Sequence, residues 1–262
     1  MHTLEARNIC KFYDTRDGVL TVLNGLCFHA DRDEFVSFVG PSGCGKSTLF
    51  NIITGLLEPD MGSILVDGDD RTGRSNEKVG YVLQKDLLFP WRTVLENIVL
   101  GLEVRGGNKA EALDKAHALL KKYRMQGYGN KYPGSISGGM RQRVALMRTM
   151  ITDPEVILMD EAYKALDYPL KITLESELLE MLREERKTIV FVTHDIEEAV
   201  TLSDRVYVMK ARPGEIVGEI SVDLGTDSSD IPTRRMSRHF NDYYELIWKS
   251  IASPVSAAEE VA

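Results

Sequence analysis

A glycine-rich segment over residues 40–47 has residue types and a spacing that suit phosphate binding. It reads Gly-Pro-Ser-Gly-Cys-Gly-Lys-Ser and fits the pattern G-x-x-x-x-G-K-[ST], with a β-rich run before it and a helical pattern after it. Its glycines let backbone N–H groups turn towards phosphate oxygens, and the following helix N-terminus adds a positive dipole end. Lys46 is expected to contact the β- and γ-phosphates, and the Ser47 hydroxyl to ligate Mg²⁺. This phosphate-binding loop (P-loop) predicts a nucleoside-triphosphate site at Gly40, Pro41, Ser42, Gly43, Cys44, Gly45, Lys46, Ser47 and Thr48.

Two adjacent acids, Asp160 and Glu161, follow a short apolar run over residues 156–159. Ligands bind at the carboxyl ends of strands in open parallel sheets, so these side chains are expected to face a ligand. Asp160 fits the Mg²⁺-side acid of P-loop enzymes. Glu161 is placed to orient or deprotonate an attacking water. Without other motifs nearby, two acids at a strand end more often serve only as polar groups exposed to solvent. Together with a phosphate-binding loop in the same chain, they favour phosphoryl chemistry.

Composition limits the remaining function classes. The chain has 262 residues, 43% hydrophobic and 27% charged, which predicts one large or two modest globular domains. Its net charge of −8 argues against a nucleic-acid partner. No apolar run approaches the roughly 18 residues that span a bilayer, and the first residues lack an apolar signal core, so we expect neither a membrane helix nor export. The three cysteines suggest no disulfide framework or zinc site.

The elements that must position these residues alternate along the chain. Strands are predicted at residues 4–9, 20–28, 34–39, 78–83, 156–159 and 188–192, with a polar turn at residues 14–18. Helices are predicted at residues 47–54, 94–103, 108–120, around 174–182 and 196–200, and around 240–251. Strands that alternate with helices indicate an α/β fold with a mostly parallel sheet. Residues 85–152 are mainly helical, which predicts a helical subdomain.

With these residues in place, the chain resembles the ATP-binding cassette (ABC) family over residues 3–222. Residues 137–143, Ser-Gly-Gly-Met-Arg-Gln-Arg, are similar to the signature loop of that family. The resemblance implies a P-loop NTPase (ABC ATPase) fold with a mostly parallel core sheet, an N-terminal antiparallel β subdomain and the helical subdomain. It assigns residues 1–222 to the ATPase domain and leaves residues 223–262 as a C-terminal helical tail with a frayed end.

The resemblance also implies roles for single residues. Gln84 resembles the glutamine that touches Mg²⁺ and senses a membrane partner, and His194 resembles the switch histidine at the γ-phosphate. Asp167 ends a segment similar to the loop that links two sites of a dimer, and Tyr13 matches the aromatic that stacks on adenine. In this family two cassettes sandwich two nucleotides, so Ser137, Gly138 and Gly139 of one subunit would face the P-loop of the other.

A narrower resemblance is to the branch that imports nitrate, sulfonates and taurine, which also includes bicarbonate and nucleobase-precursor importers. It rests on Leu-Phe-Pro-Trp at residues 88–91, on Met140 in place of glutamine, and on residues 211–214. It implies a peripheral protein at the cytoplasmic face of the inner membrane, with a membrane-spanning permease, a second cassette in a homodimer and, indirectly, a solute-binding protein as partners. The apolar residues 87–91 either receive a coupling helix of the permease or pack in the core.

The sequence departs from the branch at several positions, and in the segment after the two acids Ala162 replaces a proline and Lys164 replaces a glycine. Because both acids remain, we expect hydrolysis to persist, with its rate in question. The alternatives are a non-transport member of the superfamily, which would have a long coiled insertion, a basic surface or two cassettes, and a weakly hydrolysing regulatory module. A metabolic kinase would leave residues 137–143 unexplained.

Overall fold

The computed structural model describes residues 2–161 and 167–252. Its N-terminal part is an antiparallel sheet in the order β2-β1-β4-β5. The strands are β1 (Leu4–Thr15), β2 (Gly18–Ala30), β4 (Met61–Val66) and β5 (Asp69–Asp70). The predicted turn at residues 14–18 joins β1 to β2, and both strands run further than the sequence pattern indicated. The resemblance to a cassette with an N-terminal antiparallel sheet is confirmed here.

The second sheet is mostly parallel and has the order β10-β9-β3-β8-β7-β6. Its strands are β3 (Phe35–Val39), β6 (Val79–Val82), β7 (Val156–Asp160), β8 (Thr188–Thr193), β9 (Arg205–Lys210) and β10 (Glu215–Ser221). Only the pairing of edge strand β10 with β9 is antiparallel. Every residue of β3 and β8 is buried, as expected for strands covered on both faces. The carboxyl ends of β3, β6, β7 and β8 therefore meet at one edge.

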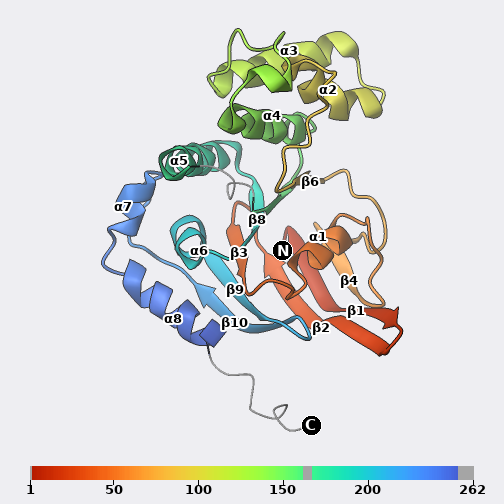
Figure 1. Cartoon of the computed structure of the whole chain (residues 1–262), viewed down its shortest axis with the longest axis vertical. Coiled ribbons are helices and arrows are strands. Elements are labelled where there is room, and N and C mark those ends of the chain that lie inside the picture. Colours follow the sequence, from red (N-terminus) through yellow and green to blue (C-terminus); the bar gives the residue numbers. More distant parts are fainter. Residues whose placement is uncertain (1, 162–166, 253–262) are drawn as a thin grey trace.

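Helices cover both faces of this sheet. On one face, α1 (Lys46–Ile53) packs between the two sheets, where Leu49, Phe50 and Ile53 join a common hydrophobic core. On the other face lie α5 (Tyr168–Glu185) and α6 (Ile196–Leu202) (Figure 1). Leu174 and Leu178 are buried on α5, which confirms the predicted apolar stripe for these two positions.

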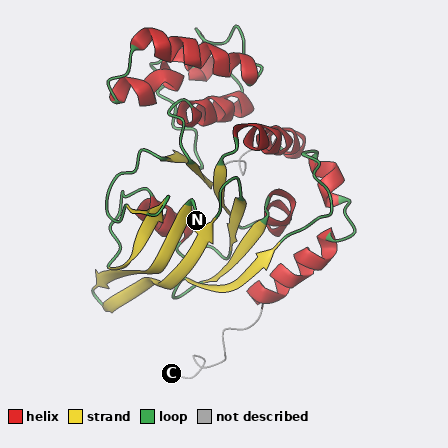
Figure 2. Ribbon diagram, turned by 180° about the vertical axis from the view of Figure 1, so that it is seen from behind, coloured by secondary structure: helices red, strands yellow, loops and turns green. Residues whose placement is uncertain are grey.

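A helical region with its own core occupies one end of the molecule (Figures 1 and 2). It comprises α2 (Val94–Val104), α3 (Lys109–Lys122), the short 3₁₀ helix η1 (Pro133–Ser135) and α4 (Gly138–Met150). A capping box between Thr93 and Glu96 starts α2. Buried residues of all three α-helices, such as Ile98, Leu120 and Val144, pack together. This region lies within the predicted helical subdomain.

The C-terminal segment packs against the sheet. Helix α7 (Ile231–Arg235) and helix α8 (Phe240–Ala252) follow β10. Phe240 and Ile247 of α8 share a core with Ile196 and Val200 of α6. The predicted helix around residues 240–251 is thus present. The tail was predicted to end in a frayed segment, and residues 253–262 lie outside the described residues. Within residues 2–161 and 167–252, no helix is both long enough and apolar enough to cross a membrane.

Candidate nucleotide site

The P-loop connects the end of β3 to the start of α1, as the sequence predicted. Gly43 and Gly45 have φ angles of 81° and 93°, in the left-handed region that favours glycine. A Cβ atom on Gly45 would lie 2.4 Å from Leu23 Cδ2, and one on Gly40 would lie 2.6 Å from the Met209 carbonyl oxygen. The glycines are therefore required both by backbone conformation and by close packing against neighbouring strands.

The loop wraps around the ammonium group of Lys46, which is only 8% exposed. Its Nζ donates to the carbonyl oxygens of Gly40 and Pro41, at 2.7 and 3.0 Å. The Cys44 thiol is fully buried, with Sγ 3.5 Å from this Nζ. Cys44 thus contributes its backbone to the loop while its side chain packs beneath it. This arrangement concentrates one positive charge at the point where a phosphate chain would enter.

Asp160 faces the first turn of α1 from the end of β7. Its Oδ2 accepts from the Ser47 hydroxyl at 3.3 Å and from the Tyr81 hydroxyl at 3.4 Å. Burial raises the pKa of Asp160, and the hydrogen bond from Ser47 counteracts that rise. Hydroxyl and carboxylate oxygens are ligands that Mg²⁺ prefers, so the pair Ser47 and Asp160 fits a magnesium site. The sequence analysis did not predict Tyr81 as a site residue, because the residues around it in β6 do not indicate that its hydroxyl contacts Asp160 of β7.

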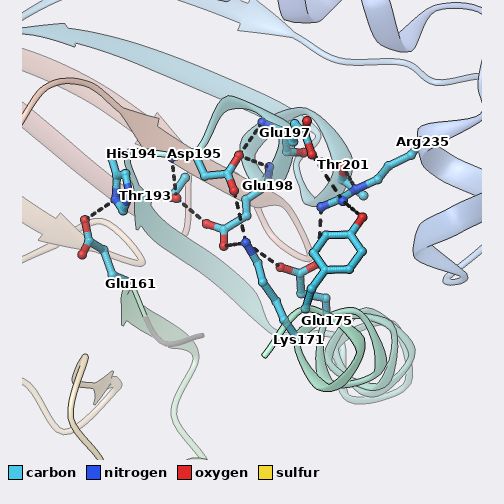
Figure 3. Close-up of polar contacts among 11 residues, drawn as sticks. Glu161, Lys171, Glu175, Thr193, His194, Asp195, Glu197, Glu198, Thr201 and Arg235 are labelled. Carbon is cyan, nitrogen blue, oxygen red and sulfur yellow. Dashed lines mark hydrogen bonds and ion pairs between the residues drawn. The ribbon is translucent and has the colours of Figure 1, made fainter. Parts of the chain in front are cut away.

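Glu161 joins the two other predicted catalytic side chains. Its Oε1 lies 2.7 Å from His194 Nδ1, and its Oε2 accepts from Gln84 Nε2 at 3.1 Å. Figure 3 shows Glu161 and His194 facing each other. Gln84 follows β6, Glu161 follows β7 and His194 follows β8, so the parallel sheet brings them together from distant parts of the sequence. The structure therefore assembles three of the four predicted catalytic residues into one contact group.

A cleft of about 370 Å³ runs between the P-loop and this group. It is lined by Val22, Ser42, Gly43, Gly45, Lys46, Ser47, Thr48, Gln84, Asp160 and Glu161. Val22, on β2, was not predicted. An apolar strand residue can be assigned to this cleft only when the topology of the sheets is known. Lys46, the fourth predicted catalytic residue, lies in this cleft with Gln84 and Glu161.

Other predicted residues lie away from this cleft. Tyr13 and residues 137–139 are not among the described residues that line the cleft. Tyr13 is near the far end of β1, with Lys11 Nζ 5.6 Å from its ring centre, so its stacking on adenine stays a prediction. Ser137 caps α4 in the helical region, with its hydroxyl accepting from Met140 N at 3.3 Å.

The loop after Glu161 is only partly described. Asp167 accepts a hydrogen bond from Leu170 N at 3.0 Å and so begins α5. The departures at Ala162 and Lys164 lie outside the described residues. Gly139 packs close to α5, since a Cβ atom there would lie 2.8 Å from Leu170 Cδ2. The signature-like segment and Asp167 thus lie near the same helix, outside the chain's own cleft.

Comparisons with known proteins identify the family of this chain. The family model described as ABC transporter matches residues 23–164. An uncharacterized ABC transporter ATP-binding protein of Methanocaldococcus jannaschii is 41% identical over 244 residues, covering 93% of this chain and 89% of that protein. The aliphatic sulfonates import ATP-binding protein SsuB of Bacillus thuringiensis subsp. konkukian is 40% identical over 214 residues, covering 82% and 84% of the two chains.

A solved structure extends the comparison to three dimensions. It is the dimeric post-hydrolysis state of an ATP-binding cassette bound to ADP and Pi, with a TM-score of 0.73 and 32% identity. The match covers 84% of this chain and 99% of that one. Fold, cleft and relatives agree: the chain belongs to the ABC transporter family, as an ATP-binding ATPase subunit of a transporter.

Proposed function

We propose that this chain hydrolyses ATP with Glu161 as general base and so energises an importer of a small anion or sulfonate-like solute. The observation that carries the proposal is the contact group of Glu161, Gln84 and His194 beside the P-loop. Phosphoryl transfer depends mainly on positioning and charge stabilisation, and these are what the cleft supplies.

Each side chain has a role that follows from its place. Lys46 is positioned to neutralise charge on the β- and γ-phosphates, because it is buried in the P-loop and lines the cleft. Ser47, Asp160 and the amide oxygen of Gln84 would hold Mg²⁺, which when bound supplies further charge neutralisation along the phosphate chain. Gln84 and His194 fix the Glu161 carboxylate from two sides, so that it can take a proton from water aligned with the γ-phosphate.

The direction of transport and the class of solute are inferred from the narrower resemblance. Residues 88–91 and 211–214 match the branch that imports nitrate, sulfonates, taurine and bicarbonate. The similarity to an aliphatic sulfonates import protein supports this class. We therefore assign the chain to the cytoplasmic face of the membrane, with a membrane-spanning permease as its partner and a solute-binding protein as an indirect one.

The surface offered to the permease is the segment of residues 86–92. Leu87 and Trp91 are 54% and 70% exposed, and the Trp91 ring stacks on Phe89 at 5.1 Å. Side chains from other elements hold its backbone through hydrogen bonds: Arg148 donates to the Leu87 carbonyl at 2.8 Å, and the buried Asn97 accepts from Phe89 N at 2.8 Å. A rigid backbone that presents large apolar side chains to solvent supports docking rather than core packing as the role of this segment.

Replacing Glu161 with glutamine tests the catalytic assignment. Glu161→Gln keeps the size and one hydrogen-bond acceptor but removes the base, so we expect ATP binding to persist and turnover to fall at least about 100-fold. Glu77→Gln, at an exposed position in the turn before β6, is the matched control and should keep wild-type turnover. Phosphate release with Mg-ATP and equilibrium binding of ATP measure the two properties separately.

The same assay separates the alternatives. Near-normal turnover in Glu161→Gln would remove Glu161 from the role of base. Absence of turnover in the wild-type chain, alone and with its permease, would favour the weakly hydrolysing regulatory module.

A further inference from the structure

A buried group of charged residues lies behind the histidine and joins three helices. We call Lys171 and Glu175 of α5, Glu198 of α6 and Arg235 of α7 the charge cluster. Figure 3 shows it on the far side of His194 from Glu161. None of its members lines the nucleotide cleft among the described residues. It is therefore separate from the site described above, although it is connected to that site through the chain.

One end of the cluster fixes the residues on both sides of His194. Lys171 Nζ lies 2.5 Å from Glu198 Oε1 and 3.1 Å from Asp195 Oδ2. The Thr193 hydroxyl donates to the Glu198 carboxylate and accepts from Asp195 N. Asp195 in turn caps α6 by accepting from Glu197 N at 2.9 Å. Lys171 thus holds residues 193–195 in the conformation that directs His194 towards Glu161.

The other end of the cluster depends on the C-terminal segment. Glu175 is fully buried, and neither of its carboxylate oxygens has a hydrogen-bond partner among the described residues. Its charge is balanced by Lys171 Nζ and Arg235 Nη2, each 3.8 Å away. A buried carboxylate without hydrogen bonds is costly, and the two cations next to Glu175 favour its charged form.

Arg235 also ties the beginning of α5 to α6. Its Nη1 donates to the Tyr168 hydroxyl at 2.8 Å and lies 3.4 Å from Glu197 Oε2. Helix α7 is anchored beside it, because Ile231 N donates to the Ser176 hydroxyl at 3.2 Å and Ile231 is fully buried. The C-terminal segment thereby contacts both the residue that follows Asp167 and the helix that follows His194.

We propose that Arg235 is a positioning residue for ATP hydrolysis, acting through Glu175 and Lys171 on the conformation of residues 193–195. The inference rests on the proposed hydrolytic role of Glu161 and His194. Without Arg235, Lys171 is the only cation left beside Glu175 in the cluster, and it is drawn away from Glu198 and Asp195. Residues 193–195 then lose their support, and the contact between His194 and Glu161 is misaligned. None of the contacts that the cluster makes among the described residues involves the P-loop, so we expect ATP binding to be unaffected.

The experiment compares full-length variants in the presence of Mg-ATP. Arg235→Met should lower kcat about 10-fold and leave KM for ATP within about twofold, because positioning of the reacting groups is lost but ground-state binding is not. Arg238→Met, an exposed arginine three positions further on, is the matched control and should keep wild-type kcat. Arg235→Lys restores a positive charge near Glu175 and should recover kcat to within about threefold of wild type.

A double variant tests whether Arg235 acts through Glu175. In Glu175→Gln/Arg235→Met no carboxylate is left without its cation, so Lys171 keeps its contacts with α6 and kcat should return to within about threefold of wild type. If Arg235→Met alone does not fold, the double variant can still be assayed and still tests the proposal. A double variant that stays as slow as the single one would overturn the proposal, as would equal kcat values for Arg235→Met and Arg238→Met.

The two proposals fail in different ways. If the wild-type chain hydrolyses ATP and Glu161→Gln does not, while Arg235→Met matches its control, then only the role of Arg235 is wrong. If Glu161→Gln retains turnover, the proposed function is wrong, and the positioning role that rests on it falls with it.

Discussion

Single residues at this site are held by neighbours that are distant in sequence. Glu161 has a φ angle of 42°, which is costly for a residue with a side chain, by about 1–2 kcal/mol. Its backbone N–H donates to the Val192 carbonyl of the adjacent strand at 3.0 Å, and its carboxylate is held by Gln84 and His194. Such local strain at a candidate base is typical of functional positions, where surrounding contacts impose the conformation.

Glu175 makes stability depend on pH in a predictable direction. Burial, followed by the nearby Glu198, raises its pKa from an ordinary 4.5 to about 7, although Lys171 and Arg235 oppose the rise. Asp195 also faces the cluster and raises this pKa. A raised pKa means that the folded state binds the proton more tightly. The resulting stabilisation is present below pH 4.5 and is lost as pH rises through about 7.

The variant Glu175→Gln removes this titration. As pH rises from 4.5 to 7, the free energy of unfolding of the wild type should fall by about 1–3 kcal/mol more than that of Glu175→Gln. The substitution also removes the carboxylate beside Lys171 and Arg235, so the test compares how stability changes with pH in the two proteins and not their absolute stabilities. Urea unfolding at several pH values measures the difference, with Glu77→Gln as the control. Parallel curves for wild type and Glu175→Gln would show that Glu175 does not titrate there.

Local spacing and the family resemblance together predicted every described residue that lines the cleft except Val22, but none of the charge cluster behind it. The P-loop, Asp160 and Glu161 each follow a short apolar strand, so their place at a sheet edge could be inferred. The charge cluster could not, because the burial of Glu175 depends on α7, which lies more than fifty positions further along the chain. Likewise Tyr81 and Val22 reach the site only through strand pairing and sheet packing.

At the scale of elements, the site is an edge where parallel strands end. The strands with continuous apolar runs, β3, β7 and β8, were predicted close to their observed bounds. The strands β4, β5, β9 and β10 were not predicted; β5 has only two residues, and a glycine interrupts the sequences of β4 and β10. Helix starts were more predictable: the helix predicted from residue 108 begins there, and the side chain of Asn108 caps α3 by accepting from Ala110 N.

The segment of residues 86–92 is the element on which permease binding depends. Trp91→Ser removes its largest exposed apolar side chain, so we expect at least about a 10-fold loss of affinity for the membrane-spanning subunit. The unfolding temperature should stay near that of the wild type, since most of the ring faces solvent. Copurification from cells that co-express the permease measures the binding.

The sequence offers a matched control for this prediction. Trp248, on α8, is the other tryptophan and is 56% exposed. Trp248→Ser should bind the permease as the wild type does. Equal recovery of permease with the two variants would contradict the assignment of residues 86–92 as the docking surface.

At the scale of the whole molecule, the parts expected to hold one nucleotide lie in different regions of the chain. The P-loop is in the body that holds the two sheets, whereas Ser137 is at the start of α4 in the helical region (Figure 1). The related cassette bound to ADP and Pi is dimeric. We therefore predict that ATP is shared between the P-loop of one subunit and residues 137–139 of a second copy, and that hydrolysis requires the pair.

Light scattering of the Glu161→Gln variant tests this claim most directly, because ATP that is bound but not hydrolysed should keep the two subunits together. We predict monomer mass without nucleotide and twice that mass with Mg-ATP. Adding Ser137→Arg should return the variant to a monomer, while Ser75→Arg, at an exposed position of the sheet body, should not. A Glu161→Gln chain that stays monomeric at saturating ATP, or a Ser137→Arg/Glu161→Gln chain that dimerises equally well, would contradict the account.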